Sequence, residues 1–113
     1  MKPSRAERRE FERNSQYVRY LDLQKAPHRY KDAQVTMFGS ITWITELENG
    51  TTELIFYGEE IHLIGPGNEG EFHVILADHT PHVTGDWVRV QGWLTGRTHD
   101  GRPILNAQWV YKP

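Results

Sequence analysis

The 113-residue sequence contains no cysteine. Disulfide bonds, thiolate zinc sites and a cysteine nucleophile are therefore excluded. A chain of this length buries well over half of the surface that its unfolded form exposes, so it can fold as one domain without such cross-links. The absence of cysteine is also compatible with a reducing compartment.

Long hydrophobic runs are missing as well. The longest apolar runs span only a few residues, whereas a membrane-spanning helix needs roughly 20. Residues 1–12 are charged and lack the apolar segment of a secretory signal. We therefore expect a soluble, cytoplasmic protein that has no membrane partner.

The short motifs that mark catalytic centres are absent. The sequence contains neither a Gly-x-Ser-x-Gly elbow nor a phosphate-binding loop with its lysine. Glu59 and Glu60 are adjacent, so on a regular strand they would point to opposite faces and could not act as an acid/base pair. We predict that the protein is not an enzyme and needs no cofactor.

Six histidines raise the question of a metal site. Asp78, His79 and His82 fall in one predicted loop, and His99 falls in another. Structural zinc sites need four ligands and catalytic sites normally need three, and the helical His-Glu-x-x-His pattern is missing. A polar loop containing Pro81 explains these residues as well, so we predict no metal site.

Charge is distributed unevenly along the chain. Residues 1–32 contain nine Lys/Arg and five Asp/Glu, a net charge of +4, whereas residues 33–113 contain four and ten, a net charge of −6. The hydrophobic pattern changes at the same place. We therefore predict two parts: a basic N-terminal helical arm with its linker over residues 1–32, and a β-barrel domain over residues 33–113.

The arm has the pattern of a helix. Ser4 followed by Glu7 matches a capping box, in which each residue bonds to the backbone amide of the other. Three apolar residues then recur near one face at helical spacing: Phe11, Val18 and Leu21. We expect a helix over residues 4–24 and, because Pro27 disfavours helix at the residue before it, a linker over residues 25–33.

From residue 33 onward, apolar residues alternate with a period of two, which indicates strands. The strands are expected at residues 35–47, 52–57 (continuing at 61–64 after a break at Gly58), 71–77, 86–97 and 102–111. Asn49-Gly50 predicts a hairpin turn, residues 65–68 a loop, and residues 78–85 an irregular connection. Gly39 and Gly92 lie inside strands and indicate the bends that allow a sheet to close into a barrel.

The fourth predicted strand shows two distinct faces. Val88, Val90 and Leu94 face one way, which predicts that they fill the barrel. The other face carries Trp87, Arg89, Gln91 and Trp93, which would then lie outside. The two remaining tryptophans, Trp43 and Trp109, follow apolar residues in phase, so we expect both in the core.

Two segments resemble the OB-fold family. Residues 35–41 (VTMFGSI) look like its bent first strand, and residues 85–94 (GDWVRVQGWL) look like the glycine-aspartate, alternating-valine, glycine pattern of its fourth strand. The resemblance is to bacterial single-stranded DNA-binding proteins and to the OB modules of anticodon-binding proteins, and it covers about residues 33–112. It implies an all-β fold, a five-stranded Greek-key barrel. Its ligand would lie across the second and third strands, between the loops at residues 48–51 and 98–101.

This sequence departs from the family pattern in three ways. The connection over residues 78–84 is too short for the helix that many members place there. The acidic flexible tail of bacterial single-strand binders is missing, which removes the usual segment that recruits partners. The barrel itself is acidic, which weighs against nucleic-acid binding.

Aromatic rings beside cations suggest a binding module for single-stranded DNA or RNA, because every base can stack on a ring. The candidate site residues on the fourth strand are Trp87, Arg89, Trp93 and Arg97. The arm would add Arg5, Arg8, Arg9 and Arg13, which would neutralise phosphates and make binding depend on salt.

Several alternatives stay open. The arm also contains Glu7, Glu10 and Glu12, so it is equally consistent with a solvated helix held by its own ion pairs. The Trp87/Trp93 face is either exposed or covered by the N-terminal helix or a second subunit. The alternative function is therefore a protein-interaction scaffold subunit of a replication, repair or mobile-element complex, or a homo-oligomer, with the tryptophans as anchors. In a further variant the arm itself is the docking element.

Overall fold

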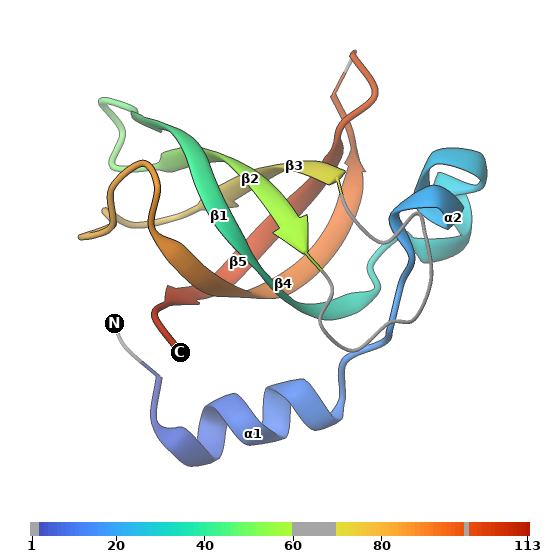
Figure 1. Cartoon of the computed structure of the whole chain (residues 1–113), viewed down its shortest axis with the longest axis horizontal. Coiled ribbons are helices and arrows are strands. Elements are labelled where there is room, and N and C mark those ends of the chain that lie inside the picture. Colours follow the sequence, from blue (N-terminus) through green and yellow to red (C-terminus); the bar gives the residue numbers. More distant parts are fainter. Residues whose placement is uncertain (1–2, 60–69, 99) are drawn as a thin grey trace.

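The protein is a closed five-stranded barrel with helices at its N-terminus (Figure 1). The computed structural model describes residues 3–59, 70–98 and 100–113. The strands are β1 (Gln34–Glu46), β2 (Thr52–Glu59), β3 (Gly70–Leu76), β4 (Trp87–Arg97) and β5 (Pro103–Tyr111). They close in the order β1-β2-β3-β5-β4, with β3 and β5 parallel and the other four pairings antiparallel. The predicted all-β barrel is confirmed.

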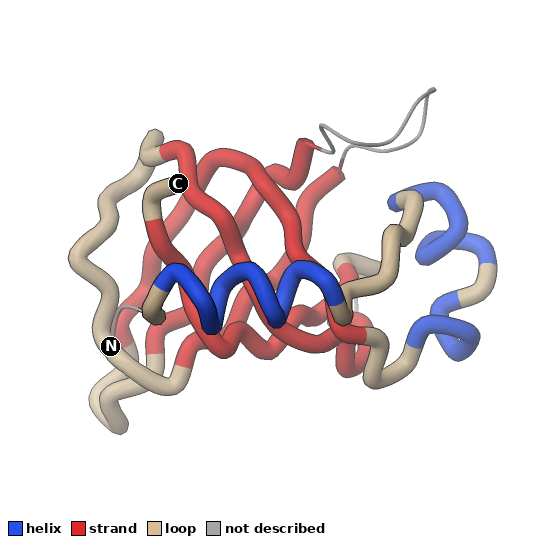
Figure 2. The backbone as a smooth tube through the Cα atoms, turned by 90° about the horizontal axis from the view of Figure 1, so that it is seen from below, coloured by secondary structure: helices blue, strands red, loops and turns tan. Residues whose placement is uncertain are grey.

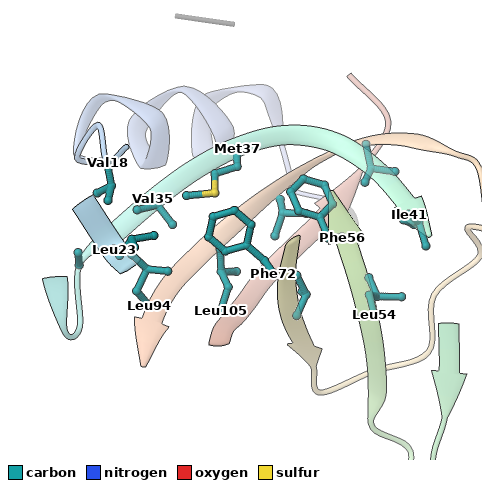
Figure 3. Close-up of a cluster of buried hydrophobic side chains, with 14 residues drawn as sticks. Val18, Leu23, Val35, Met37, Ile41, Leu54, Phe56, Phe72, Leu94 and Leu105 are labelled. Atoms are coloured by element: carbon teal, nitrogen blue, oxygen red, sulfur yellow. The ribbon is translucent and has the colours of Figure 1, made fainter. Parts of the chain in front are cut away.

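Alternate residues of every strand fill the barrel interior. Val88 and Val90 are fully buried and Leu94 nearly so, as their alternation predicts. Figure 3 shows the core residues that meet them from the other strands, among them Val35, Met37, Ile41, Leu54, Phe56, Phe72 and Leu105. Burying one large apolar side chain stabilises a fold by about 1.5–3 kcal/mol, so this interior is the main source of stability.

β1 takes part in both halves of the barrel. Residues 34–40 pair with β4, and residues 38–46 pair with β2. Gly39 lies where the two pairings overlap, and a Cβ atom there would collide with the carbonyl oxygen of Tyr57. The bend in β1 therefore requires a residue without a side chain at this position.

A bulge in β1 reverses the facing of the residues that follow it. The register with β2 shifts between Ile41 and Trp43, which leaves Thr42 without a partner in the pairing. Ile44 consequently packs against the core, and Trp43 is 64% exposed. The prediction that Trp43 is a core residue is wrong, because it assumed unbroken alternation through Thr42.

A second bulge, in β5, acts on Trp109 in the same way. Trp109 pairs with Gln91 and Val110 pairs with Val90, whereas Ala107 pairs with Gly92, so Gln108 is the additional residue. Val110 therefore packs against the core while Trp109 lies on the outer surface with Gln91. The prediction of a core position for Trp109 is wrong for the same physical reason.

β2 differs from its prediction at Gly58. This residue lies within the strand, where it pairs with Gly39 and Gly70, so the predicted break is wrong. The predicted continuation at residues 61–64 and the loop at residues 65–68 lie outside the described residues.

The arm forms three short helices: α1 (Arg5–Arg13), α2 (Tyr20–Lys25) and the 3-10 helix η1 (Pro27–Tyr30). The predicted capping box is present, since the Ser4 hydroxyl accepts the Glu7 amide at 3.1 Å and the Glu7 carboxylate accepts the Ser4 amide at 2.9 Å. The prediction of one helix over residues 4–24 is wrong, and η1 occupies part of the predicted linker. The chain leaves the helix after α1 because the Gln16 amide donates to the Gln34 carbonyl oxygen of β1 at 2.7 Å.

The helices occupy different sides of the barrel. α2 and η1 lie at one end, where Val18 and Leu23 join the core near Val35 and Leu94 (Figure 3). α1 lies across the outside of the strands (Figure 2). No helix within residues 3–59, 70–98 and 100–113 has the length and apolar character that crossing a membrane requires.

Candidate functional site

The outer surface of the barrel has two regions that carry aromatic side chains. The first, which we name the covered face, lies beneath α1 (Figure 2). It is built from the outward residues of β1, β4 and β5: Phe38, Arg89, Gln91, Trp93, Trp109 and Tyr111. As the sequence predicts, Arg89 and Trp93 point away from the interior that Val88 and Val90 fill.

α1 holds to the covered face through one aromatic residue. Phe11, which is 9% exposed, is the buried residue of this helix. Its ring lies edge-on to Trp93 at a centroid distance of 5.4 Å and to Trp109 at 5.7 Å. Edge-to-face packing of this kind is favourable because the positive rim of one ring meets the negative face of the other.

Two arginines lie against aromatic rings at the same interface. The Arg89 guanidinium carbon is 4.0 Å from the Phe38 ring centroid, and that of Arg8 is 5.1 Å from the Tyr111 ring centroid. Arg89 Nη1 is also 3.7 Å from Glu12 Oε2 of α1. The covered face therefore combines π-surfaces with a cation that α1 partly neutralises.

Polar groups at this interface are incompletely satisfied. Gln91 Nε2 donates to the Arg8 carbonyl oxygen at 3.1 Å. Among the residues that the structure describes, three other buried side-chain atoms have no hydrogen-bond partner: Arg8 Nε, Arg89 Nε and Gln91 Oε1. Burial raises the pKa of Tyr111. Each buried polar atom without a partner costs about 1–3 kcal/mol. These atoms therefore lower the stability of α1 in its docked position.

The other predicted site residues are dispersed. Trp87 is 40% exposed and pairs with Ser40 of β1. Arg5, Arg9 and Arg13 are exposed on α1. The backbone of Arg97 pairs with Pro103 at the end of β4. The structure thus brings Arg8, Arg89 and Trp93 together, whereas Trp87, Arg5, Arg9 and Arg13 are exposed.

The second region, which we name the open face, is the outer surface of β1, β2 and β3 after the bulge in β1. One cross-strand row runs through directly paired residues of four strands: Trp43, Ile55, His73 and Ile104. Two residues further along their strands, Tyr57 of β2 and Ile75 of β3 lie on the same face. Paired side chains on one face lie about 4.5–5.5 Å apart at Cβ, so these residues form a continuous surface.

Two turns flank the open face. Figure 1 shows the β1–β2 turn at the upper left of the barrel and the β4–β5 turn at the upper right, with β1, β2 and β3 between them. Gly50 and Gly101 adopt φ of 87° and 92° in these turns, a region that favours glycine. The Asn49 side chain accepts the Thr51 amide at 3.0 Å, which confirms the predicted Asn-Gly hairpin.

Charges on the open face are paired with one another. Arg102 Nε donates to Glu71 Oε2 at 3.0 Å, and its guanidinium lies 3.5 Å from Asp100. His73 Nε2 is 3.7 Å from Glu53 Oε2. By contrast, Trp43 exposes its ring while its indole N–H donates to Thr45 Oγ1 at 3.0 Å. The open face therefore offers an aromatic surface among carboxylates that either pair with Arg102 or lie beside His73.

The family resemblance placed the ligand in the region of the open face, across the second and third strands, but the sequence-based list of site residues named none of its side chains. The signal was available in β1, because Ile41 and Ile44 are three residues apart and unbroken alternation cannot place both in a core. A bulge between them places Trp43 outside. Tyr57 and Ile55 then share its face through their pairing with β1.

The loop histidines contact different groups. His79 Nδ1 is 3.9 Å from Glu46 Oε1. His82 lies with Nε2 at 3.1 Å from the Val110 carbonyl oxygen and Nδ1 at 3.7 Å from Asp86 Oδ2. His99 lies outside the described residues.

The barrel is similar to one of known structure. The crystal structure of the small single-stranded DNA-binding protein from Streptomyces coelicolor matches with a TM-score of 0.54, covering 74% of this chain and 94% of that chain at 18% sequence identity. The 113-residue chain therefore has an OB-type fold. The predicted resemblance is confirmed at the level of fold. No family model and no curated protein match the sequence.

Proposed function

We propose that this protein is a non-catalytic OB module that binds single-stranded nucleic acid on its open face. The observation that carries this proposal is the 64% exposed Trp43, which lies on the outer surface of the sheet between the two projecting turns. A protein with a similar barrel is a single-stranded DNA-binding protein. Both facts favour a strand laid across β2 and β3.

Stacking would supply most of the affinity. One base would stack on the Trp43 ring, and the neighbouring Ile55 and Tyr57 would extend the surface to the next base. Base–aromatic stacking contributes about 1–3 kcal/mol per base and tolerates any sequence. Trp87 continues this surface, because it pairs with Ser40 and Ser40 pairs with Tyr57.

Phosphate contacts would contribute less. Arg102 is engaged by Glu71 and Asp100, so it must exchange these carboxylates for a phosphate. The arm carries exposed cations, among them Arg5, Arg9 and Arg13, that would contact the strand backbone. We therefore expect modest affinity and a shallow dependence on salt compared with basic OB modules.

The test is fluorescence anisotropy of a labelled oligodeoxythymidine, with the matching RNA and a duplex, over a series of salt concentrations. Trp43→Ala should weaken single-strand binding roughly 5- to 150-fold, the equivalent of about 1–3 kcal/mol. Tyr17→Ala is the matched control, because Tyr17 is an aromatic residue with 66% exposure that lies between α1 and α2. Equal affinities of Trp43→Ala and the wild type, or no binding by the wild type at low salt, would contradict the proposal.

A protein partner is the second candidate, and the charge of the open face favours it. Glu53 and Glu71 both lie on this face, and the chain beyond residue 32 has a net charge of −6. A basic protein surface would complement these carboxylates while Trp43 acts as the anchor. Light scattering and pull-down with Trp43→Ala separate this candidate from the first, since it predicts Trp43-dependent association without oligonucleotide binding.

A further inference from the structure

We propose that the covered face is a second single-strand-binding surface and that α1 is its intramolecular competitor, which leaves when a strand binds. This inference rests on the proposed function and extends it to a second side of the barrel. It is carried by the composition of the covered face, by the groups with which α1 occupies it, and by the weak attachment of α1.

The covered face has the composition of a stacking surface. Trp93 and Trp109 lie side by side under Phe11, which packs on both rings. Arg89 lies over Phe38 on the adjoining part of β1. Aromatic rings next to an arginine bind single strands without sequence preference, because bases stack on the rings while the cation attracts the backbone.

α1 fills this surface with groups that correspond to parts of a nucleotide. Phe11 sets its ring edge-on against the two tryptophans and so occupies the space in which a base would stack on them. The next residue, Glu12, places a carboxylate 3.7 Å from Arg89, as a phosphate would. A strand that stacked on Trp93 and paired with Arg89 would therefore replace the contacts that α1 makes.

α1 is attached weakly enough to be displaced. It has nine residues, and helices of fewer than about 12 residues are marginal without tertiary packing. Within the described part of the chain, its docking leaves Arg8 Nε, Arg89 Nε and Gln91 Oε1 buried without hydrogen-bond partners. Residues 14–19 are not helical, and the Gln16 amide within them donates to the Gln34 carbonyl oxygen of β1, so displacement of α1 would leave α2 on the barrel.

Displacement would also release cations. Arg8 lies against Tyr111 when α1 is docked, and Arg89 is paired with Glu12. Once α1 leaves, both guanidinium groups are available to phosphates together with Arg5, Arg9 and Arg13. A strand on the covered face should therefore be bound with a steeper salt dependence than a strand on the open face.

The first test compares two substitutions on α1 in the full chain. Glu12→Gln removes the carboxylate that faces Arg89, and we expect oligodeoxythymidine to bind at least twofold more tightly. Glu10→Gln is the matched control, because Glu10 is exposed on the same helix and the change in net charge is identical. An equal effect of the two substitutions would reduce the result to net charge and overturn the inference.

Phe11→Ala removes the ring that occupies the two tryptophans, and we expect at least a fivefold gain in affinity and a steeper salt dependence. Thermal unfolding checks that this variant keeps a folded barrel. Unchanged or weaker binding by a folded Phe11→Ala protein would overturn the inference.

Hydrogen exchange provides a readout in the unaltered protein. Saturating oligodeoxythymidine should lower the protection of the α1 amides, whereas unchanged or increased protection would overturn the inference. The two proposals are separable. If Trp43→Ala abolishes binding while α1 substitutions have no effect, only the open face binds. If the Phe11→Ala protein binds tightly whether or not it also carries Trp43→Ala, only the covered face binds the strand.

Discussion

The covered face and the open face are two parts of one outer surface, and they differ in what satisfies their side chains. On the covered face, Arg89 and Tyr111 are largely withdrawn from solvent and lie against rings and α1. On the open face, Trp43 is exposed and the neighbouring charges pair with each other. Both faces are produced by the same strand alternation, so alternation alone does not distinguish a docking surface for the chain's own helix from one for a ligand.

The difference arises along β1, which contributes to both faces. Its first half presents Phe38 to the covered face, and its second half presents Trp43 to the open face. Gly39 and the bulge at Thr42 separate the two halves. A bend without a side chain and one additional residue therefore determine which aromatic ring meets α1 and which meets solvent.

Removing the bend in β1 should disrupt the covered face and the open face together. Gly39→Ala places a methyl group against the Tyr57 carbonyl oxygen, which cannot move without disrupting the pairing of β1 with β2. We expect a loss of about 3 kcal/mol or more in the free energy of unfolding, the upper end of the range for overpacking. Chemical denaturation measures it. Gly96→Ala is the control, because a Cβ atom at Gly96 of β4 meets no other atom; comparable losses in the two variants would refute this account of the bend.

Three aromatic truncations should rank the regions by stability. Phe56→Ala, in the fully buried core, should cost about 3–5 kcal/mol. Phe11→Ala should cost at most about 2 kcal/mol, because the loss stops once α1 has left the barrel. Trp43→Ala should change the free energy of unfolding by less than about 0.5 kcal/mol, since its ring is exposed. If Phe11→Ala cost as much as Phe56→Ala, the covered face would be part of the core rather than a docked surface.

Most of the barrel was predictable because its signals are local. The alternation of Val88, Val90 and Leu94 identified the interior, and Asn49-Gly50 identified a hairpin. The capping box at Ser4 and Glu7 located the start of α1. Each of these depends on a few neighbouring residues and the geometry of one element.

The errors arose where distant parts of the chain decide the outcome. The single predicted helix is interrupted because Gln16 bonds to Gln34, a contact that forms only when the barrel exists. Trp43 and Trp109 were assigned to the wrong face because each follows a bulge, and one additional residue reverses every later side chain. Trp87, Arg89 and Trp93 were correctly placed outside the barrel, yet the sequence left open whether α1 would cover them.

The start of β4 at Trp87 forms the border between the covered face and the open face, and its stability should depend on acid. Asp86, directly before Trp87, accepts the Val83 amide at 3.0 Å, and its carbonyl oxygen accepts the Ile41 amide of β1. The Val83 hydrogen bond, aided by Lys112 and His82 and opposed by partial burial, holds the pKa of Asp86 below its usual range.

A lowered pKa in the folded state means that the unfolded chain binds the proton more readily. The stability that Asp86 contributes is thus complete above the ordinary carboxyl pKa of about 4 and declines as the pH falls further. Asp86→Asn should be less stable than the wild type at neutral pH and should lose less stability between about pH 5 and pH 3. Thermal unfolding over this range measures the difference, and parallel profiles for the two proteins would show that the Asp86 carboxylate does not stabilise the border. A loosened border should also increase the quenching of Trp87 fluorescence while Trp93, under α1, stays protected, so the same variant tests whether the two faces can be disturbed separately.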